Sequence, residues 1–347
     1  MEKIRIGVIC PSEIAFRRFL PSLRKSDDFE YVGVAYATAE EWFGASWTDV
    51  QETQRNKIEA VEQEKAEKFQ REFGGEVVKG YGQMVSSEQV DAIYLPLPPA
   101  LHFKWAKLAL QCGKHVLIEK PSTIALADTQ ELVSLANRNG LVLHENYMFV
   151  FHNQLTAITD IIHNGKIGDV RLIRITFGFP QRSVTDFRYN KSLGGGALLD
   201  AGGYTLKLAT YLLGENVKIT AAAAGYKSNF DVDIYGSATM ENSDGIVAQL
   251  AFGMDNDYRC DLEVWGSEGT LTTSRVLTAP DGFVPTYTIK KNQDIEHGTL
   301  PADDAFLKSI QHFGQCVTDV SAREKNYHSL LFQEQLIEEY KHLSKMQ

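Results

Sequence analysis

The chain has 347 residues, of which 44% are hydrophobic and 23% are charged, a composition typical of a globular protein. This length exceeds that of one typical core and predicts two domains. The net charge of -10 argues against a general nucleic-acid binder, which carries a basic footprint. No apolar run approaches the roughly 20 residues that span a bilayer. The four cysteines are scattered, without metal or disulfide spacing, so we expect free thiols, no metal and a cytoplasmic location.

The N-terminal part of the chain alternates between strand and helix patterns, which predicts a mostly parallel sheet. Short apolar runs are typical of buried strands, and segments with helical spacing follow them. The expected strands are Ile4–Ile9, Tyr31–Ala37, Asp91–Leu97, Val116–Ile118 and Leu141–Leu143, and the expected helices are Ile14–Leu23, His102–Cys112 and Thr129–Asn139.

One segment, Glu40–Glu72, is long, charged and rich in acidic residues. Within it, Val50–Phe73 has high helical propensity but only a thin apolar stripe. The pattern favours a solvated helical excursion. The alternative is a lid or an oligomer contact near a bound cofactor.

The second half of the chain has a different pattern, in which strand-length runs follow one another with short turns. Such a series predicts a largely antiparallel sheet, and the end of the chain returns to helix. The expected strands are Val170–Phe179, Lys218–Tyr226, Ile234–Glu241, Ile246–Phe252, Asp261–Trp265 and Gly269–Ser274, and the expected helices are Leu155–Asn164, 302–318 and 327–346.

A parallel sheet that begins at Ile4 raises the hypothesis of a dinucleotide-binding domain. The fingerprint of its first turn is Gly-x-Gly-x-x-Gly or Ala, whereas this chain has Cys10, Ser12 and Ala15 at those positions. Ser12 can offer its hydroxyl or N–H to a phosphate, but the charge of Glu13 would repel one. The candidate cofactor contacts are Gly7, Cys10, Ser12, Glu13, Ile14, Arg18, Thr38, Pro96, Leu97, His102, Glu119 and Lys120.

The end of the second strand usually distinguishes NAD from NADP. An acidic residue there binds the ribose diol, and an arginine accommodates the 2′-phosphate. This strand instead ends in Tyr36-Ala37-Thr38, which provides neither group, although Arg17 and Arg18 on the first helix could reach a 2′-phosphate. NADP and NAD are therefore both open, with NADPH favoured.

The run Glu119-Lys120-Pro121 follows the apolar strand Val116–Ile118. A strand with this ending places a lysine just beyond the carboxyl end of the sheet, where ligands bind in open α/β folds. The proline prevents the strand from continuing. The alternative interpretation of Lys120 is an ordinary surface lysine.

A second group of candidate residues begins with the three glycines Gly194–Gly196, which give a loop backbone freedom. The following segment, Ala197–Leu213, is expected to be helical, with Asp200 and Tyr204 four residues apart on one face. A tyrosine that acts as a general acid near neutral pH benefits from a nearby cation, and Lys120 could supply it. The alternative is a core tyrosine whose hydroxyl is satisfied by Asp200 or water.

Together these features resemble the glucose–fructose oxidoreductase, inositol dehydrogenase and rhizopine catabolism (Gfo/Idh/MocA) family. The resemblance covers essentially the whole chain and implies a Rossmann domain over 1–145 and an α+β domain over 146–347, whose final helix can pack back on the first domain. The matched segments are Ile93–Pro98 with Leu101-His102, Gly113–Pro121, Tyr147–Phe149 with Phe151-His152, Gly165–Gly168, Gly194–Asp200 and Glu263–Gly269.

The resemblance also implies roles for individual residues. Lys120 corresponds to the family lysine near the nicotinamide, and Tyr204 stands where many members have a histidine acid/base. The segment Phe252–Pro280 is similar to that of the nucleotide-linked sugar 3-ketoreductases of deoxysugar biosynthesis. The open sheet of the second domain usually serves oligomerisation, so a homodimer or homotetramer is expected.

The leading hypothesis is therefore an NAD(P)-dependent ketoreductase that acts on a keto-sugar, with Tyr204 as the proton donor, Lys120 as an electrostatic aid and Asp200 as an orienting group. One alternative is a dehydrogenase of a free sugar, inositol or dihydrodiol. The other is a non-catalytic protein that binds a dinucleotide or sugar and regulates a partner. Substrate-binding candidates are Tyr147, from the matched motif, and, on charge alone, Arg188, Lys191 and Arg259.

Overall fold

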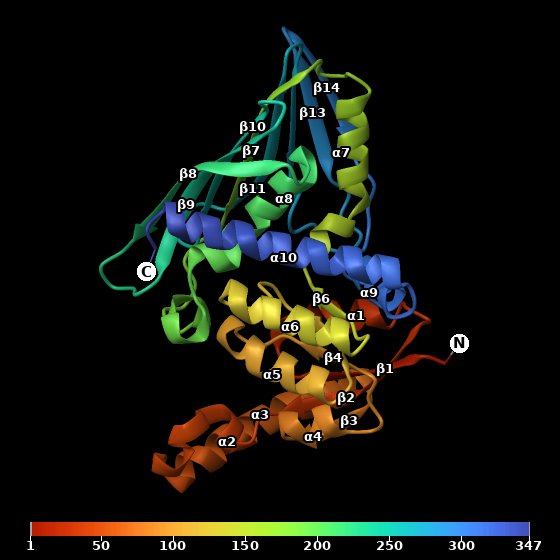
Figure 1. Cartoon of the computed structure of the whole chain (residues 1–347), viewed down its shortest axis with the longest axis vertical. Helices are drawn as coiled ribbons and strands as arrows, with labels where there is room; N and C mark the ends of the chain where they lie inside the picture. Colours follow the sequence, from red (N-terminus) through yellow and green to blue (C-terminus); the bar gives the residue numbers. More distant parts are fainter. Residues whose placement is uncertain (1, 347) are drawn as a thin grey trace. The chain divides into compact units, whose positions relative to one another are not determined.

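The computed structural model describes residues 2–346, which divide into two compact units (Figure 1). The first unit runs to Thr123 and adds Ala127–Asn146 and Ser309–His328. The second unit comprises Ile124–Leu126, Tyr147–Lys308 and the chain from Ser329 onward. Each unit contains one sheet.

The sheet of the first unit has six strands in the order β3-β2-β1-β4-β5-β6, and every neighbouring pair is parallel. The strand order reverses between β1 and β4, and ligands bind at the carboxyl edge of such a switch point. This topology confirms the expected Rossmann fold. The strands are β1 Ile4–Ile9, β2 Phe29–Tyr36, β3 Glu76–Lys79, β4 Ala92–Leu95, β5 His115–Ile118 and β6 Leu143–Glu145.

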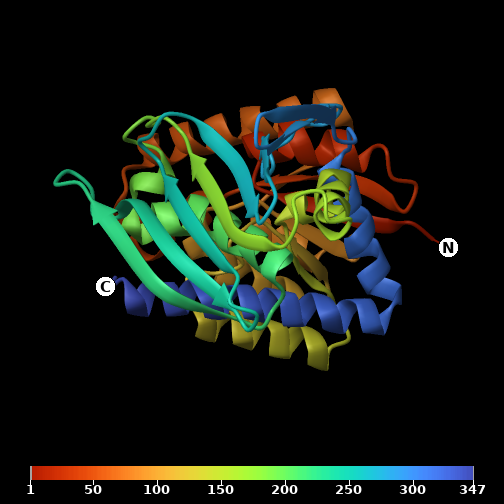
Figure 2. The same ribbon diagram turned by 90° about the horizontal axis from the view of Figure 1, so that it is seen from above.

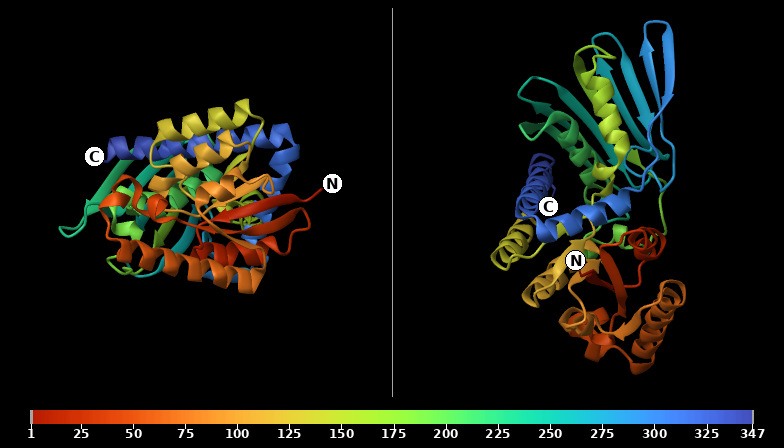
Figure 3. Two further views of the ribbon diagram at one scale, coloured as in Figure 1. Left: turned by 90° about the horizontal axis from the view of Figure 1, so that it is seen from below. Right: turned by 90° about the vertical axis from the view of Figure 1, so that its right-hand side faces the viewer.

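Helices cover both faces of this sheet, with α3 on the opposite side from α5 and α6 (Figure 3, left). On one face, the ring of Phe16 lies 5.1 Å from the rings of both Phe69 and Phe73. On the other face, Tyr81 meets Trp105 with ring centroids 5.2 Å apart. The helices are η1 Ala15–Phe19, α1 Leu20–Leu23, α2 Ala39–Phe43, η2 Gly44–Asp49, α3 Glu52–Phe73, α4 Tyr81–Ser86, α5 Pro99–Gln111 and α6 Leu126–Arg138.

The acidic excursion forms α2, η2 and most of α3. Helix α3 buries Glu62, Ala66 and Phe69, and this spacing of three to four residues corresponds to one face of a helix. The buried face packs against β2 and β3. Helix α3 is thus solvated only on its outer side and forms an integral layer of the first unit, whereas the described residues of 40–50 are all exposed or half-buried.

The sheet of the second unit has eight strands in the order β14-β13-β12-β11-β7-β10-β9-β8 (Figure 2). All neighbouring pairs are antiparallel except β7 and β10, which are parallel, so the expected mostly antiparallel sheet is confirmed. The strands are β7 Val170–Gly178, β8 Val217–Tyr226, β9 Asp233–Asn242, β10 Val247–Gly253, β11 Arg259–Gly266, β12 Thr270–Ser274, β13 Thr286–Lys291 and β14 Asp294–Thr299.

In the part of the chain that the structure describes, helices cover one face of the large sheet and leave the other face bare. In β7, Ile173, Ile175 and Phe177 are buried, and α8 packs on β7, β9 and β10. On the opposite face, Trp265 and Tyr235 are 51% and 50% exposed. The remaining helices are η3 Met148–Phe151, α7 Asn153–His163, η4 Phe187–Tyr189, η5 Lys191–Leu193, η6 Leu198–Gly202, α8 Gly203–Leu213, α9 Ala305–Thr318 and α10 Val320–Leu343.

Within residues 2–346, no helix has both the length and the apolar character needed to cross a membrane.

Candidate active site

The turn after β1 keeps a glycine-like conformation without a glycine. Cys10 has φ 86°, a left-handed value that non-glycine residues seldom adopt. Its N–H donates to Ala35 O at 3.0 Å, and Ser12 Oγ accepts from Ala15 N at 3.3 Å. Burial raises the pKa of the Cys10 thiol to about 11, so the thiol is neutral near pH 7. The turn therefore combines tight geometry with an uncharged side chain, which suits the approach of a pyrophosphate.

Two candidate cofactor contacts, Gly7 and His102, have structural roles. Gly7 lies inside β1, where an added Cβ would be 2.6 Å from Met84 Sδ, so its lack of a side chain serves packing. His102 is fully buried, with its ring nitrogens 2.8 Å from Pro121 O and 2.7 Å from Leu97 O. Burial lowers the pKa of His102 to about 4, although the contacts with the two carbonyls act to raise it. A neutral ring donates a hydrogen bond to only one of these carbonyls, so that bond holds either the loop after β5 or the end of β4.

The remaining candidates in the first unit lie near the carboxyl edge of its sheet. Thr38 Oγ1 accepts from Glu41 N at 3.1 Å, and the Glu41 carboxylate accepts from Thr38 N at 2.9 Å, which forms a capping box at the start of α2. The hydroxyl of Thr38 is thus used within the protein. Pro96 and Leu97 are buried, Ser12, Ile14 and Arg18 are half-buried, and Glu13 is exposed.

Lys120 lies on a rigidly held segment. The preceding carboxylate, Glu119 Oε1, accepts hydrogen bonds from Tyr94 Oη at 2.6 Å and from Asn146 Nδ2 at 2.7 Å. Burial raises the pKa of Glu119. On the other side, Ser122 N donates to a glutamate carboxylate of β6 at 2.8 Å. Tyr94 and Asn146 were missed from the sequence, although both lie at or next to the carboxyl ends of strands, where such support is expected.

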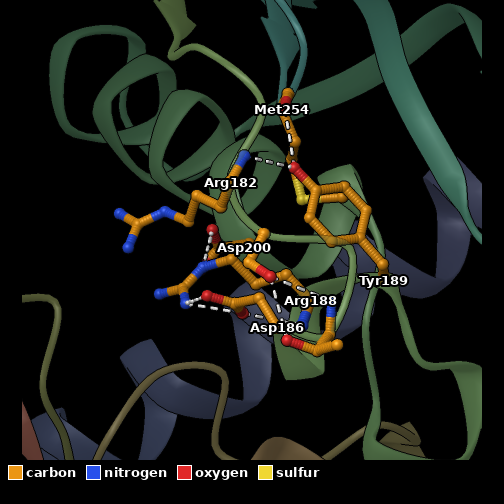
Figure 4. A network of polar contacts seen from close by, with 8 residues as sticks. Arg182, Asp186, Arg188, Tyr189, Asp200 and Met254 are labelled. Atoms are coloured by element: carbon orange, nitrogen blue, oxygen red, sulfur yellow. Dashed lines mark hydrogen bonds and ion pairs between the residues drawn. The ribbon is translucent and has the colours of Figure 1, made fainter.

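In the second unit, Arg188 is held between two carboxylates (Figure 4). Its Nε donates to Asp200 Oδ2 at 2.6 Å, and its Nη1 donates to Asp186 Oδ1 at 3.1 Å. Burial acts to lower the pKa of Arg188, but pairing with both aspartates outweighs it and raises the pKa. Arg188 therefore orients Asp200, and two carboxylates offset its charge, which makes it a poor pyrophosphate ligand. Asp186 was missed from the sequence.

A second contact fixes the loop next to Arg188. Tyr189 Oη donates to Met254 O and accepts from Arg182 N, both at 3.0 Å (Figure 4). The loop is thereby tied to the residue that follows β10.

The three glycines allow this loop to pack closely. An added Cβ on Gly195 would lie 2.4 Å from Arg188 O, and one on Gly196, which has φ +124°, would lie 2.3 Å from Asp233 Oδ1. Asp233 Oδ2 accepts from Leu198 N at 2.7 Å. Asp233 thus anchors the start of η6, a π-helical turn that carries Asp200, and such turns are frequent at functional sites.

Tyr204 lies in the first turn of α8 and is 8% exposed. Its ring packs among Tyr147, Phe149 and Phe177, with ring centroids 5.2, 5.6 and 5.3 Å away. Tyr147 is only 1% exposed, so it supports the Tyr204 ring from within the core, whereas a substrate contact had been expected. Gln333 Nε2 donates to the carbonyl of the residue before Tyr204 at 2.9 Å and steadies the turn.

The two other substrate candidates lie in different surroundings. Lys191 lines a cavity of about 600 Å³ together with Lys341, Lys345 and Tyr226. Arg259 lies on the bare face of the large sheet, because its neighbour Cys260 points into the core, and its Nε donates to an aspartate of the same strand at 2.9 Å. The alternation of strand residues turns Arg259 away from the face that α8 covers, which excludes it from the Tyr204 site.

The comparisons with known proteins agree with these features. The model of the oxidoreductase family with an NAD-binding Rossmann fold matches residues 12–147, and the model of the GFO/IDH/MocA C-terminal domain matches residues 155–272. A dTDP-3,4-didehydro-2,6-dideoxy-alpha-D-glucose 3-reductase from Streptomyces violaceoruber is 39% identical over 315 residues, which cover 90% of this chain and 85% of the relative. The enzyme of that name from Saccharopolyspora spinosa is 33% identical over 96% of both chains.

Solved structures show the same relationship. The crystal structure of a 3-ketoreductase from Actinomadura kijaniata, in complex with NADP and TDP-benzene, superposes with a TM-score of 0.87 at 34% identity. The match covers 99% of this chain and 98% of that one.

Proposed function

The chain belongs to the Gfo/Idh/MocA family of NAD(P)-dependent oxidoreductases and acts on a keto group, and from this premise we propose that it is a 3-ketoreductase of a dTDP-linked keto-deoxysugar. The observation that carries the proposal is the 39% identity to such a reductase over 90% of the chain. Lys120, Asp200 and Tyr204 support it, because a protein that only bound sugar would not need this acid/base set.

The residues of the chain have distinct parts in this reaction. When bound, the reduced nicotinamide supplies the hydride that attacks the keto carbon. The ammonium of Lys120 stabilises the negative charge that develops on the keto oxygen, and Tyr204 donates the proton to that oxygen. Asp200, fixed by Arg188, accepts a hydrogen bond from a hydroxyl of the sugar and orients it.

The tight turn at Cys10 fits the dinucleotide, because its geometry is that of the glycine it replaces. For the nucleotide part of the substrate, the cavity beside η6 offers three lysines, Lys191, Lys341 and Lys345. Lysines are frequent phosphate ligands. We further propose that the bare face of the large sheet forms the contact of a homodimer or homotetramer, since it exposes large aromatic residues.

The test is turnover of a dTDP-linked 3-keto-deoxysugar with NADPH, measured for the wild type and for Tyr204→Phe. We expect kcat to fall by about 100-fold or more in the variant, with NADPH binding unchanged. Tyr211→Phe, which removes a hydroxyl from an exposed position on the same helix, should retain full activity. Near-wild-type turnover by Tyr204→Phe would remove Tyr204 from the acid role. Activity on free polyols alone would indicate the sugar or inositol dehydrogenase alternative.

A further inference from the structure

We propose that Arg55, on the helix within the acidic excursion, binds the 2′-phosphate of NADP and makes the protein select NADPH over NADH. The inference concerns a residue far from the usual position for this role, because the chain has Thr38 at the end of β2, where the arginine would stand. It rests on the dinucleotide binding on which the proposed function also depends.

The course of α3 places Arg55 at the correct edge of the sheet. Glu59 Oε1 accepts a hydrogen bond from Ala39 N at 2.8 Å, so α3 touches the chain just beyond the carboxyl end of β2. The helix then ends at Phe73, close to Glu76 at the amino end of β3, which runs parallel to β2. Residues before Glu59 therefore extend past the carboxyl edge. Arg55 lies one turn earlier, about 6 Å along the helix axis, on the side where the adenosine ribose binds.

The surroundings leave the Nε of Arg55 without an acceptor. Its Nε is buried and has no hydrogen-bond partner within residues 2–346, and its guanidinium lies over the ring of Trp47 at 5.2 Å. Glu59, the carboxylate one turn away, already accepts from Ala39 N and from Lys79 Nζ, the latter at 2.7 Å. A buried N–H that lacks an acceptor destabilises a protein, so this guanidinium is expected to receive an anion from outside the chain.

Nearby acidic groups do not oppose an anion at this position. The pKa of Glu59 is lowered overall, since its bonds to Lys79 and Ala39 and the positive charges of Lys79 and Arg55 outweigh the effect of burial. Its direct ion pair is with Lys79, at 2.7 Å. The Glu41 carboxylate accepts hydrogen bonds from three backbone N–H groups, those of Thr38, Tyr81 and Gly82, each at 2.9 Å. Within residues 2–346, the guanidinium of Arg55 thus forms no direct ion pair, and its fork matches the oxygens of a phosphate.

The experiment is titration of the purified full-length protein with NADPH and with NADH, followed by nicotinamide fluorescence. For Arg55→Gln we expect the Kd for NADPH to rise by about 10- to 100-fold, the range for loss of hydrogen bonds to a charged group, and the Kd for NADH to change by less than about twofold. Arg71→Gln is the matched control, since Arg71 lies near the other end of α3 and is largely exposed. It should leave both constants unchanged.

Two further measurements distinguish loss of the 2′-phosphate contact from other effects of the substitution. Arg55→Lys keeps the charge but loses the fork, and should give an intermediate Kd for NADPH. Adenosine 2′,5′-bisphosphate should compete better than 5′-AMP with the wild type, and no better with Arg55→Gln. Three results would overturn the inference while leaving ketoreduction possible. They are an equal loss of affinity for NADPH and NADH in Arg55→Gln, no loss of affinity for either, and a wild type that prefers NADH. Selective NADPH binding without turnover of any dTDP-keto-sugar would instead overturn the proposed function alone.

Discussion

The carboxyl group of Asp233 gives the second unit a pH dependence that one substitution should remove. Burial raises the pKa of Asp233 from 3.8 to about 6, and the side chain is only 3% exposed. The folded protein therefore binds a proton more tightly than the unfolded chain. The stability contributed by this group is full below about pH 4 and is lost as the pH rises through 6. At 1.36 kcal/mol per pKa unit, the loss is about 3 kcal/mol at pH 7.5.

Asp233→Asn should abolish this loss, because the amide carries no charge and its oxygen can still accept from Leu198 N. We expect the difference in unfolding free energy, variant minus wild type, to be about 3 kcal/mol larger at pH 7.5 than at pH 4. Urea unfolding at fixed ionic strength, with tryptophan fluorescence and circular dichroism as probes, measures the difference. Asp231→Asn makes the same charge change at an exposed position two residues away and should have little effect. Parallel pH curves for wild type and Asp233→Asn would refute the reasoning.

Three further sets of substitutions test the geometry of the site. Cys10→Gly should be about 1 kcal/mol more stable to urea than Cys10→Ala, since a left-handed backbone costs a residue with a Cβ about that much, and equal stability would contradict the strain at this turn. Gly196→Ala should lower the melting temperature by several degrees, because the new Cβ collides with Asp233 at a positive φ, and an unchanged melting temperature would argue against that contact. Arg188→Met should cost about 2–4 kcal/mol in urea unfolding by leaving Asp200 without its cation. Adding Asp200→Asn should recover much of this lost stability, because the amide carries no charge that needs a cation. If the stability losses of the two substitutions were additive, the pairing would be excluded.

Local sequence patterns predicted most of the elements that build the sheets. The buried strands of the first unit are short apolar runs, and the chain order of strands and helices indicated the parallel topology. The run around Lys120 and the triple glycine marked the two regions where polar networks are found. Strands β3, β13 and β14 were missed because they carry few buried residues, which leaves little apolar pattern to detect.

The supporting contacts could not be predicted for a different reason. Glu119 and Asn146 lie 27 residues apart in the sequence, so no local pattern joins them. The burial of Gly7 against Met84 likewise depends on a packed helix. By contrast, the sequence did hold a signal for Arg259, since its alternation with Cys260 and the next apolar residue indicates an outward side chain.

The parallel pairing of β7 with β10 has a consequence for how the protein acquires its structure. Leu172 pairs with Val247, and these positions are 247 − 172 = 75 residues apart. Closing so long a loop has a high entropic cost before any contact is gained, and non-local parallel pairing is intrinsically slow. Arg188, Asp200 and Tyr204 all lie inside this loop. During synthesis, a chain that has emerged only as far as β9 contains all three residues, but it lacks β10, the strand that lies between β7 and β9 in the sheet.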